Sequence, residues 1–321
     1  MPKALVTGAG GFVGQWLSRA LLRQGWSVTG TTLGIAPPPG ILTAADLAQM
    51  RWRGIDLRPG VDRRTLAGLL DRERPDAIFH LAAIAFVPAA GEDPMRALDT
   101  NVSAAVRLVE AMRALRAAGT MDAVLLVIGS AEQYGRHEAG PPLDEATDQR
   151  PRTFYAATKC AQEAFALAAA RADGLRVVAT RSFNHSGPGQ APEFLLPALV
   201  RRAREARATP GTPVRIGNTE PVRHFLHVED VVSAYISLVE RGRPGEAYNV
   251  CSGAGATVGE IAAEVLARAG VPDPLAPDPA LRRPVDVPWL VGDNRKLRAD
   301  TGWSPRRSRA DIIDDLLHAT P

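Results

Sequence analysis

Cysteine and lysine are both rare in this chain of 321 residues. Only Cys160 and Cys251 are present, which argues against a disulfide framework and favours a cytoplasmic location. Of the 38 basic residues, only Lys3, Lys159 and Lys296 are lysine, and the others are arginine. Because arginine cannot replace a compact ammonium that must fit among its neighbours, each retained lysine is a candidate functional residue.

Long hydrophobic runs and a strong excess of one charge are also absent. No segment approaches the roughly 18 apolar residues of a membrane helix, and the first residues resemble a strand rather than a signal region, so we expect no membrane partner. The formal net charge is +3, which argues against a nucleic-acid partner, and the arginine-rich stretch 201–207 is typical of a solvated helix face. His224 and His227 have no Cys or carboxylate cluster fitted to them, so no metal site is predicted.

The order of apolar segments predicts an α/β fold for residues 1–180. Short apolar runs alternate there with helical patterns, which is typical of a doubly wound parallel (Rossmann) sheet covered by helices on both faces. The expected strands are 4–7, 27–31, 77–81, 124–130 and 176–181. The expected helices are 12–24, 63–73, 94–117 and 154–172.

Residues 181–321 have a different pattern, with short segments that are rich in proline and glycine. Helices are expected at 192–207, 228–240 and 258–269, and the proline-rich stretch 272–284 is expected to be a loop. We interpret this half as a smaller mixed α/β substrate domain, with a segment near 222–245 that returns to the first domain.

A glycine-rich turn at residues 7–14 follows the first expected strand and opens the first expected helix. Gly8 permits the tight turn, Gly11 lets the backbone approach a pyrophosphate, and Gly14 lets the helix pack on the strand. The start of the helix then offers unpaired N–H groups to phosphates. This context predicts a dinucleotide cofactor.

The end of the second expected strand bears on which nicotinamide cofactor binds. An acid at that place would hold a ribose 2′-hydroxyl, but this chain has Thr31 and Thr32 there. Because no acid stands at this place to repel a 2′-phosphate, the pattern favours NADPH. No arginine stands there to bind a 2′-phosphate either, so NADH remains an alternative. Asp56 and Leu57 could hold and cover adenine, or form an ordinary turn.

Tyr155 and Lys159 stand four residues apart in an expected helix and therefore share one face. A nearby ammonium stabilises phenolate and lowers a tyrosine pKa, and it can also hold a cofactor ribose. Ser130 ends the strand 124–130, at the edge of the sheet where ligands bind, and its hydroxyl can donate to a substrate carbonyl. The alternatives are a half-buried Tyr beside a surface Lys, and a Ser that only caps a strand end.

Several motifs together resemble the extended short-chain dehydrogenase/reductases. They are TGAGGFVG at 7–14, HLAA at 80–83, GSAEQYG at 129–135 and YAATK at 155–159. The segment RSFNHSGPGQ at 181–190 resembles more narrowly the branch that acts on GDP-mannose-derived sugars. VRHFLHVED at 222–230, YNVCSG at 248–253 and RPVDVPWLVG at 283–292 agree with that branch.

The resemblance implies roles for individual residues. Ser130, Tyr155 and Lys159 would be catalytic. The cofactor would contact Tyr155 and Lys159 and, in addition, Gly8, Gly11, Phe12, Val13, Thr31, Thr32, Asp56, Leu57, Leu81, Ala82, Ala83, Phe183 and His185. The substrate would contact Ser130, Asn184, Arg223, Arg283 and Asp286, with the two arginines on its diphosphate, which suits the bidentate geometry of guanidinium.

The implied activity is NAD(P)H-dependent reduction of the 4-keto group of GDP-4-dehydro-6-deoxy-D-mannose, a GDP-linked deoxyhexose. Tyr155 would protonate the new alkoxide while Ser130 polarises the carbonyl. The nearest alternative is GDP-mannose 4,6-dehydration, which needs a further base that Glu132 could supply. Against it, the glycine turn and the segment 33–40 differ from the usual dehydratase pattern. A nucleotide-sugar epimerase and a non-catalytic NAD(P)-binding sensor are more remote alternatives.

Three positions depart from the pattern of the branch. Ala85 stands where many relatives have Ser, His224 replaces a common Asp, and Asp286 replaces a common Glu. Each change puts one polar contact with the cofactor or substrate in doubt. The resemblance also implies a homodimer, in which helices 94–117 and 154–172 pair with their copies in a four-helix interface.

Overall fold

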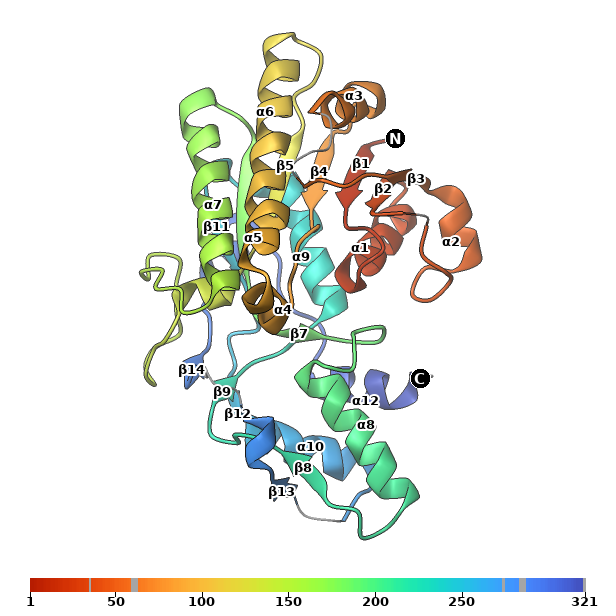
Figure 1. Ribbon diagram of the computed structural model, residues 1–321, viewed down its shortest axis with the longest axis vertical. Coiled ribbons are helices and arrows are strands. Elements are labelled where there is room, and N and C mark those ends of the chain that lie inside the picture. Colours follow the sequence, from red (N-terminus) through yellow and green to blue (C-terminus); the bar gives the residue numbers. More distant parts are fainter. Residues whose placement is uncertain (35, 59–62, 273–274, 283–286, 320–321) are drawn as a thin grey trace.

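The computed structural model describes residues 1–34, 36–58, 63–272, 275–282 and 287–319. Its centre is a seven-stranded parallel sheet in the order β11-β6-β5-β4-β1-β2-β3 (Figure 1). The strands are β1 (Lys3–Thr7), β2 (Ser27–Thr32), β3 (Arg51–Gly54), β4 (Ala77–His80), β5 (Val124–Ser130), β6 (Val177–Ser182) and β11 (Ala247–Val250). The predicted doubly wound α/β fold is confirmed. Because the strand order reverses between β1 and β4, the ligand crevice of such a sheet lies at their carboxyl ends.

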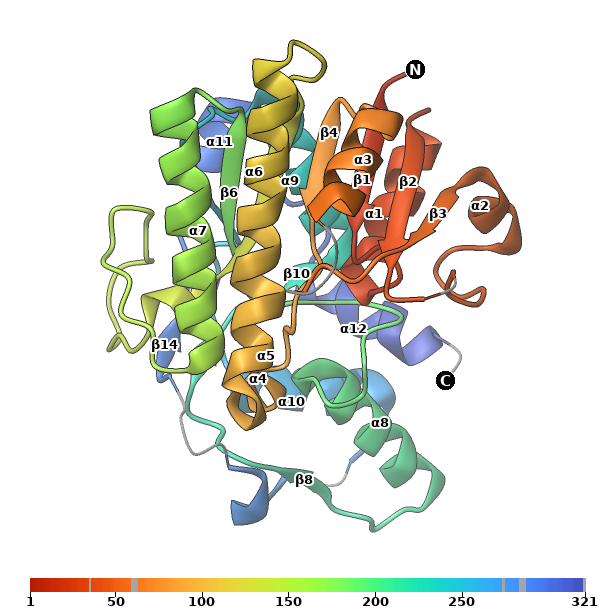
Figure 2. The same ribbon diagram turned by 45° about the horizontal axis from the view of Figure 1, so that its top comes forward.

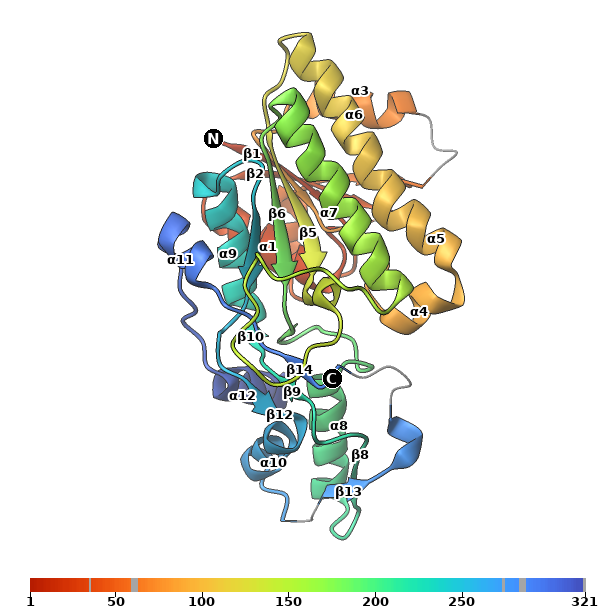
Figure 3. The same ribbon diagram turned by 90° about the vertical axis from the view of Figure 1, so that its left-hand side faces the viewer.

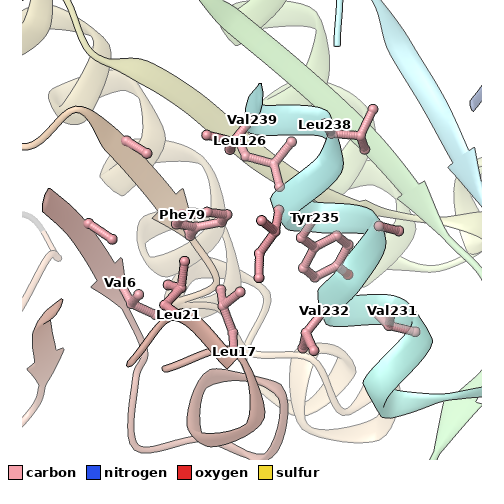
Figure 4. Packing of buried hydrophobic residues seen from close by; sticks show 14 of the residues in the cluster. Val6, Leu17, Leu21, Phe79, Leu126, Val231, Val232, Tyr235, Leu238 and Val239 are labelled. Atoms are coloured by element: carbon pink, nitrogen blue, oxygen red, sulfur yellow. The ribbon is translucent and has the colours of Figure 1, made fainter. Parts of the chain in front are cut away.

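The central strands are apolar on both faces because each face packs on its own layer of helices. Leu5 and Ile78 belong to one core cluster, whereas their neighbours Val6 and Phe79 belong to the cluster on the opposite face. Figure 4 shows the cluster that contains Val6 and Phe79. The side chains around them come from two helices, and Leu17 is one of these side chains. Alternate residues of one strand thus fill two cores, which is why the strands appear in the sequence as continuous apolar runs.

The helices form one layer on each face of the sheet (Figures 2 and 3). α1 and α9 pack against each other on one face, and α3, α6 and α7 cover the other. Their bounds are α1 (Phe12–Arg23), α3 (Arg63–Glu73), α6 (Ala104–Ala117), α7 (Phe154–Asp173) and α9 (Val228–Arg241), and α2 (Ala44–Gln49) and α4 (Val87–Glu92) are short additions.

Two strands of the sheet were not predicted, β3 and β11. β3 is an arginine-containing edge strand of four residues, so it lacks the apolar run that marks the central strands. β11 is a buried strand of four residues that follows a long excursion of the chain and contains Asn249. Its place beside β6 depends on tertiary pairing that the local pattern does not carry.

The prediction of a single continuous helix at 94–117 is wrong, because the helix changes form in its middle. The structure has α5 (Pro94–Leu98), a π-helical turn at Asp99–Ser103, and then α6. Asn101 within this turn is fully buried, and its side chain bonds to the backbone of Ile84 and to the Thr158 hydroxyl. The wider turn lets a polar side chain leave the apolar helix face and reach those partners.

Part of the chain beyond β6 forms a second core of its own, in the lower part of Figure 1. The stretch 272–284, expected to be a loop, contains a short edge strand and a 3₁₀ turn that the proline-rich pattern hides, because an edge strand tolerates Pro277 at its end. Helices α8 (Leu195–Ala208), α10 (Val258–Ala269) and α12 (Arg309–His318) pack around the strands β8 (Val214–Ile216) and β13 (Leu275–Pro277). Smaller pairings join β7 (His185–Ser186) to β10 (Leu226–His227), and β9 (Val222–Arg223) to β12 (Ala256–Thr257) and β14 (Trp289–Leu290); the remaining helical pieces are η2 (Ala131–Tyr134), η3 (Pro279–Leu281) and α11 (Arg295–Thr301).

Candidate active site

The glycine turn lies at the carboxyl end of β1, beside the segment that follows β4. Gly8 has a φ of +69°, and a Cβ on it would lie 2.9 Å from the backbone nitrogen of Ala82. A Cβ on Gly14 would lie 2.3 Å from the carbonyl oxygen of Gly8, so both positions require glycine. Gly11 begins α1 with no side-chain cap, and no acidic residue lies in the first turn. The start of α1 therefore suits a phosphate group.

Other residues predicted to bind the cofactor surround this turn. The carbonyl of Thr31 accepts a hydrogen bond from the Ala9 backbone at 3.1 Å, and the backbone N–H of Ala82 donates to the Thr7 hydroxyl at 3.2 Å. Thr32 lies at the same edge and donates through its hydroxyl to Gly34. Leu81, Ala83 and Val13 are half-buried at the ends of β4 and the start of α1.

Asp56 and Leu57 follow β3, on the outer side of the same edge. Asp56 accepts hydrogen bonds from both the backbone and the guanidinium of Arg58, and these bonds lower the pKa of its carboxyl. Leu57 packs into the core cluster beneath α3 and α6. An adenine at this place would therefore meet a carboxylate that is already paired with Arg58.

Ser130 and Tyr155 come together at the carboxyl end of β5. Ser130 is the last residue of β5, and its hydroxyl accepts a hydrogen bond from the Glu132 N–H at 3.2 Å, which caps the turn η2. Tyr155 lies in the first turn of α7, which Thr153 caps, and the Ser130 side chain lies near enough to its phenol to act on its pKa. Only 9% of Ser130 and 8% of Tyr155 are exposed.

The pKa of Tyr155 is raised to about 12, not lowered as the sequence pattern predicts. Burial is the main cause, the hydrogen bond to Ser130 acts in the opposite direction, and the nearby charge of Glu132 raises the pKa further. The ammonium of Lys159 points elsewhere, because its Nζ donates to the Ile128 carbonyl at 2.7 Å and to Gln162 Oε1 at 2.9 Å.

Lys159 is buried, and its ammonium reaches the Ile128 carbonyl near the end of β5. Burial lowers its pKa to about 7. The pKa of His80, at the end of β4, is lowered to about 3, mainly by burial and in addition by the charge of Lys159. His80 Nδ1 lies 2.8 Å from the hydroxyl of Thr7 at the end of β1. The charge of Lys159 therefore acts on the end of β4, which borders the crevice between β1 and β4.

The residues predicted to bind substrate come from two paired segments beyond β6. The backbone N–H of Leu226 donates to the Asn184 carbonyl at 2.9 Å, which brings Arg223 and Asn184 to neighbouring segments. His185 is half-buried and stacks on Phe12 of α1, with 6.3 Å between ring centroids. Arg283 and Asp286 lie outside the described residues.

Phe183, which is predicted to lie beside the nicotinamide, is a core residue in this structure. It is 2% exposed, its ring centroid lies 5.0 Å from that of His224, and a Cβ on Gly292 would collide with it. The side chain therefore fills the core under the crevice. His224 itself accepts a weak hydrogen bond from the Ser252 backbone, and burial is the main reason why its pKa is lowered to about 3.

Among the described residues, several buried polar side chains near the site were not predicted, Asn101, Gln133, Glu163 and Arg181 among them. Asn101 joins the segment after β4 to α7, and a lone amide in an apolar helical pattern was the available signal. Gln133, Glu163 and Arg181 form a buried cluster behind Ser130, for which the sequence offers no local signal because its members come from η2, α7 and β6.

The described ranges of the chain contain neither a metal-ligand cluster nor a membrane-spanning helix. No three His, Cys, Asp or Glu side chains gather there as a metal site. His227 caps α9 and contacts Asp315, so it has structural partners. No helix among the same residues has the length and apolar character to cross a bilayer.

Comparison with known proteins agrees with this geometry. The family model described as GDP-mannose 4,6 dehydratase matches residues 5–316. The chain belongs to this family. GDP-6-deoxy-D-mannose reductase of Pseudomonas aeruginosa is 33% identical over 98% of the chain and 96% of its own length. dTDP-glucose 4,6-dehydratase of Streptomyces niveus is 31% identical over 98% of the chain and 91% of its own length.

A solved structure described as RMD from Pseudomonas aeruginosa complexed with NADPH has the same fold. It superposes with a TM-score of 0.81 at 30% identity and covers 99% of this chain and 98% of its own. Membership of the GDP-mannose 4,6 dehydratase family confirms the resemblance to the extended short-chain dehydrogenase/reductases and the prediction of an NAD(P)-dependent nucleotide-sugar enzyme.

Proposed function

We propose that the protein reduces the 4-keto group of GDP-4-dehydro-6-deoxy-D-mannose to give GDP-6-deoxy-D-mannose (GDP-D-rhamnose). The nearness of Ser130 and Tyr155 to each other at the carboxyl end of β5, on the ligand edge of the sheet, carries this proposal. The similarity to a GDP-6-deoxy-D-mannose reductase supports the choice of substrate.

The chemistry requires a proton donor and a group that polarises the ketone. A bound reduced nicotinamide supplies the hydride. Tyr155 keeps its proton at neutral pH, since its pKa of about 12 lies far above 7, and an alkoxide is basic enough to take that proton. The Ser130 hydroxyl donates to the ketone oxygen, where negative charge develops. The nearly complete burial of both side chains strengthens these interactions by excluding water.

Cofactor binding would use the start of α1 for the pyrophosphate, where a side-chain cap and acidic residues are both missing. Lys159 would offer its third N–H to the ribose, because two of its donors are already used by Ile128 and Gln162. We propose NADPH as the preferred cofactor, since the end of β2 presents Thr31 and Thr32 rather than an acid.

Substrate binding would use Asn184 and Arg223 on their neighbouring segments, with Arg283 and Asp286 added by the resemblance alone. Arg223 is half-exposed, and guanidinium suits a diphosphate because it can donate two parallel hydrogen bonds.

Product analysis tests the proposed reaction. The purified protein is supplied with GDP-4-dehydro-6-deoxy-D-mannose and either NADPH or NADH, and the sugar nucleotide is identified by mass and by NMR of the carbon-4 proton. We expect the 4-hydroxyl product with oxidation of one cofactor per sugar. Cofactor binding without any turnover would point instead to a non-catalytic sensor.

Dehydration of GDP-mannose is the second candidate, because one observation favours it. The charge of Glu132 raises the pKa of Tyr155, which places the carboxylate near the reacting group. Glu132 is partly exposed in η2, directly after Ser130 and Ala131. A carboxylate at this place could remove the carbon-5 proton that dehydration requires.

Replacing Glu132 separates the two reactions. Glu132→Gln removes a base but keeps the shape, so we expect ketone reduction to stay within about fivefold of wild type, whereas a dehydratase would lose about 10²-fold or more. Each activity is measured by substrate disappearance, with GDP-mannose alone for dehydration. Appearance of the 4-keto-6-deoxy product from GDP-mannose in the wild type, and its loss in Glu132→Gln, would contradict the reductase assignment.

We propose a homodimer formed through α5, α6 and α7. On α7, Phe154 is 59% and Phe165 43% exposed, and the exposed positions between and beside them are alanines rather than charges. Met95 and Leu98 of α5 are exposed as well. An exposed apolar face of this kind is typical of a protein–protein interface.

We also propose that the protein is located in the cytoplasm, which stays a prediction.

Sedimentation velocity tests the dimer. We expect wild type to sediment as a dimer and Phe165→Glu to weaken association by about 30-fold or more, because a carboxylate would be buried in the interface. Leu281→Glu is the matched control, since Leu281 is exposed to a similar degree but lies in η3. A wild-type monomer at all concentrations, or equal effects of the two substitutions, would contradict this interface.

A further inference from the structure

The amide of Gln133 connects the two elements that carry the candidate catalytic residues. Gln133 is fully buried, and its Oε1 accepts a hydrogen bond from the Ser130 backbone N–H at 2.7 Å. Its Nε2 donates to Glu163 Oε2, also at 2.7 Å. Because the backbone N–H can only donate and the carboxylate only accept, these two partners fix the orientation of the amide.

The backbone beside Ser130 is shaped to admit this amide. A Cβ on Gly129 would lie 2.4 Å from Gln133 Oε1 and 2.2 Å from the Thr180 carbonyl oxygen. Any larger residue at position 129 would therefore displace the Gln133 amide or move β5 away from β6. The contact of Gln133 with Ser130 thus depends on the sequence on both sides of the serine.

Glu163 is a firm anchor for the other end of the amide. It lies on α7 one turn beyond Lys159, and its side chain is 4% exposed. Arg181 of β6 pairs with it at 2.7 Å through Nη2 and at 3.1 Å through Nε. A buried ion pair with two hydrogen bonds of this kind is costly to rearrange, so Glu163 holds the Gln133 amide against α7.

We propose that Gln133 is a positioning residue that fixes Ser130 relative to Tyr155. Rigid contacts run from Ser130 through Gln133 to Glu163, and Glu163 and Tyr155 lie on the same helix. This inference rests on the proposed function, in which the hydroxyls of Ser130 and Tyr155 meet one substrate oxygen. That geometry tolerates little error, since a misplacement of about 1 Å can lower the rate by about 10²-fold.

Gln149 provides a matched control for a purely structural role of the cluster. Its Nε2 donates to Glu163 Oε1 at 2.7 Å, the same length as the Gln133 bond, but its Oε1 accepts from the Gln133 amide rather than from the serine backbone. If the cluster only stabilised the fold, loss of either amide would have similar consequences. If Gln133 positions Ser130, the two losses differ in turnover.

The first experiment compares Gln133→Leu with Gln149→Leu. For Gln133→Leu we expect kcat to fall by about 10- to 100-fold, with KM for the sugar nucleotide and Kd for NADPH within about twofold of wild type. For Gln149→Leu we expect kcat within about twofold of wild type. Unchanged kcat in Gln133→Leu, or equal losses in both variants, would overturn the proposal.

A second pair of variants tests the polarity of the link. Gln133→Glu keeps the acceptor for the Ser130 N–H but sets a carboxylate against Glu163, so we expect a loss at least as large as that of Gln133→Leu. Adding Glu163→Gln gives a double variant with the same net charge as wild type, in which the carboxylate and the amide have exchanged places. The amide at position 163 can then donate to the carboxylate at position 133. We expect the double variant to recover about tenfold in kcat over Gln133→Glu, and no recovery would count against the link.

Hydrogen exchange separates this inference from the proposed function. In Gln133→Leu the Ser130 amide loses its acceptor, and we expect its exchange to be about 10-fold faster or more, whatever the enzyme turns over. If the hydrogen-exchange rate of the Ser130 amide is the same in Gln133→Leu as in wild type, that result alone contradicts the positioning role of Gln133. If the wild-type protein turns over none of the candidate sugar nucleotides, the proposed function is contradicted instead. The contacts of Gln133 would then have no catalytic role.

Discussion

Tyr155→Phe is expected to lower the turnover of the 4-keto sugar nucleotide by about 10³-fold. The substitution removes the phenol that lies next to Ser130 at the ligand edge of the sheet, and with it the proton for the developing alkoxide. Binding of NADPH should remain within about twofold of wild type, because the glycine turn and the start of α1 are unchanged. Steady-state kinetics and cofactor fluorescence titration measure the two effects separately.

Tyr248→Phe is the control for the loss of a buried hydroxyl. Its phenol lies on β11 and donates to Asp300 at 2.7 Å, away from Ser130. We expect this variant to retain kcat and to lose only stability, by about 1 kcal/mol. Normal turnover in Tyr155→Phe would exclude Tyr155 as the proton donor and remove the main support for the proposed reaction.

Acidification should destabilise the fold strongly, because two buried histidines are held neutral. Burial is the main reason why the pKa values of His80 and His224 are lowered to about 3, and the Nε2 atoms of both have no hydrogen-bond partner among the described residues. In the unfolded chain a histidine titrates near pH 6.5, so below that pH the unfolded state binds more protons than the folded state. Stability is therefore fully present above about pH 6.5 and is lost as the pH falls.

The expected loss between about pH 6.5 and pH 5 is about 2 kcal/mol for each of the two histidines. Urea unfolding at both pH values measures it. His80→Asn and His224→Asn should each remove about 2 kcal/mol of the difference, because the asparagine side chain does not titrate. His318→Asn serves as the control, since His318 is exposed at the end of α12. A stability that does not change with pH in this range would contradict the burial of neutral rings.

The elements that the sequence predicts well are those whose signal is local. The apolar runs of the central strands and the glycine turn depend on period and spacing, and both are present as expected. Tyr155 and Lys159 could be paired from their separation of four residues alone. Ser130 could be placed because a parallel strand ends at the ligand edge.

The features that the sequence does not predict depend on partners from distant elements. The pKa of Tyr155 is raised because α7 buries the phenol, and the ammonium of Lys159 is drawn to the Ile128 carbonyl and Gln162 rather than to the phenol. Spacing along a helix gives the shared face but not the third partner that competes for the charge. The same limit hides the link from Gln133 to Glu163, since the two residues are 30 positions apart.

The seventh strand has a consequence for how the protein is made. β11 completes the sheet beside β6, yet the two strands are separated in the chain by part of the second core and by α9. Until residue 250 has left the ribosome, β6 is a bare apolar edge that can pair with another nascent chain. Fragments cut after β6 should therefore precipitate when expressed alone, and a shortened chain meant to isolate the nucleotide-binding half needs the segment 226–250 joined back to it.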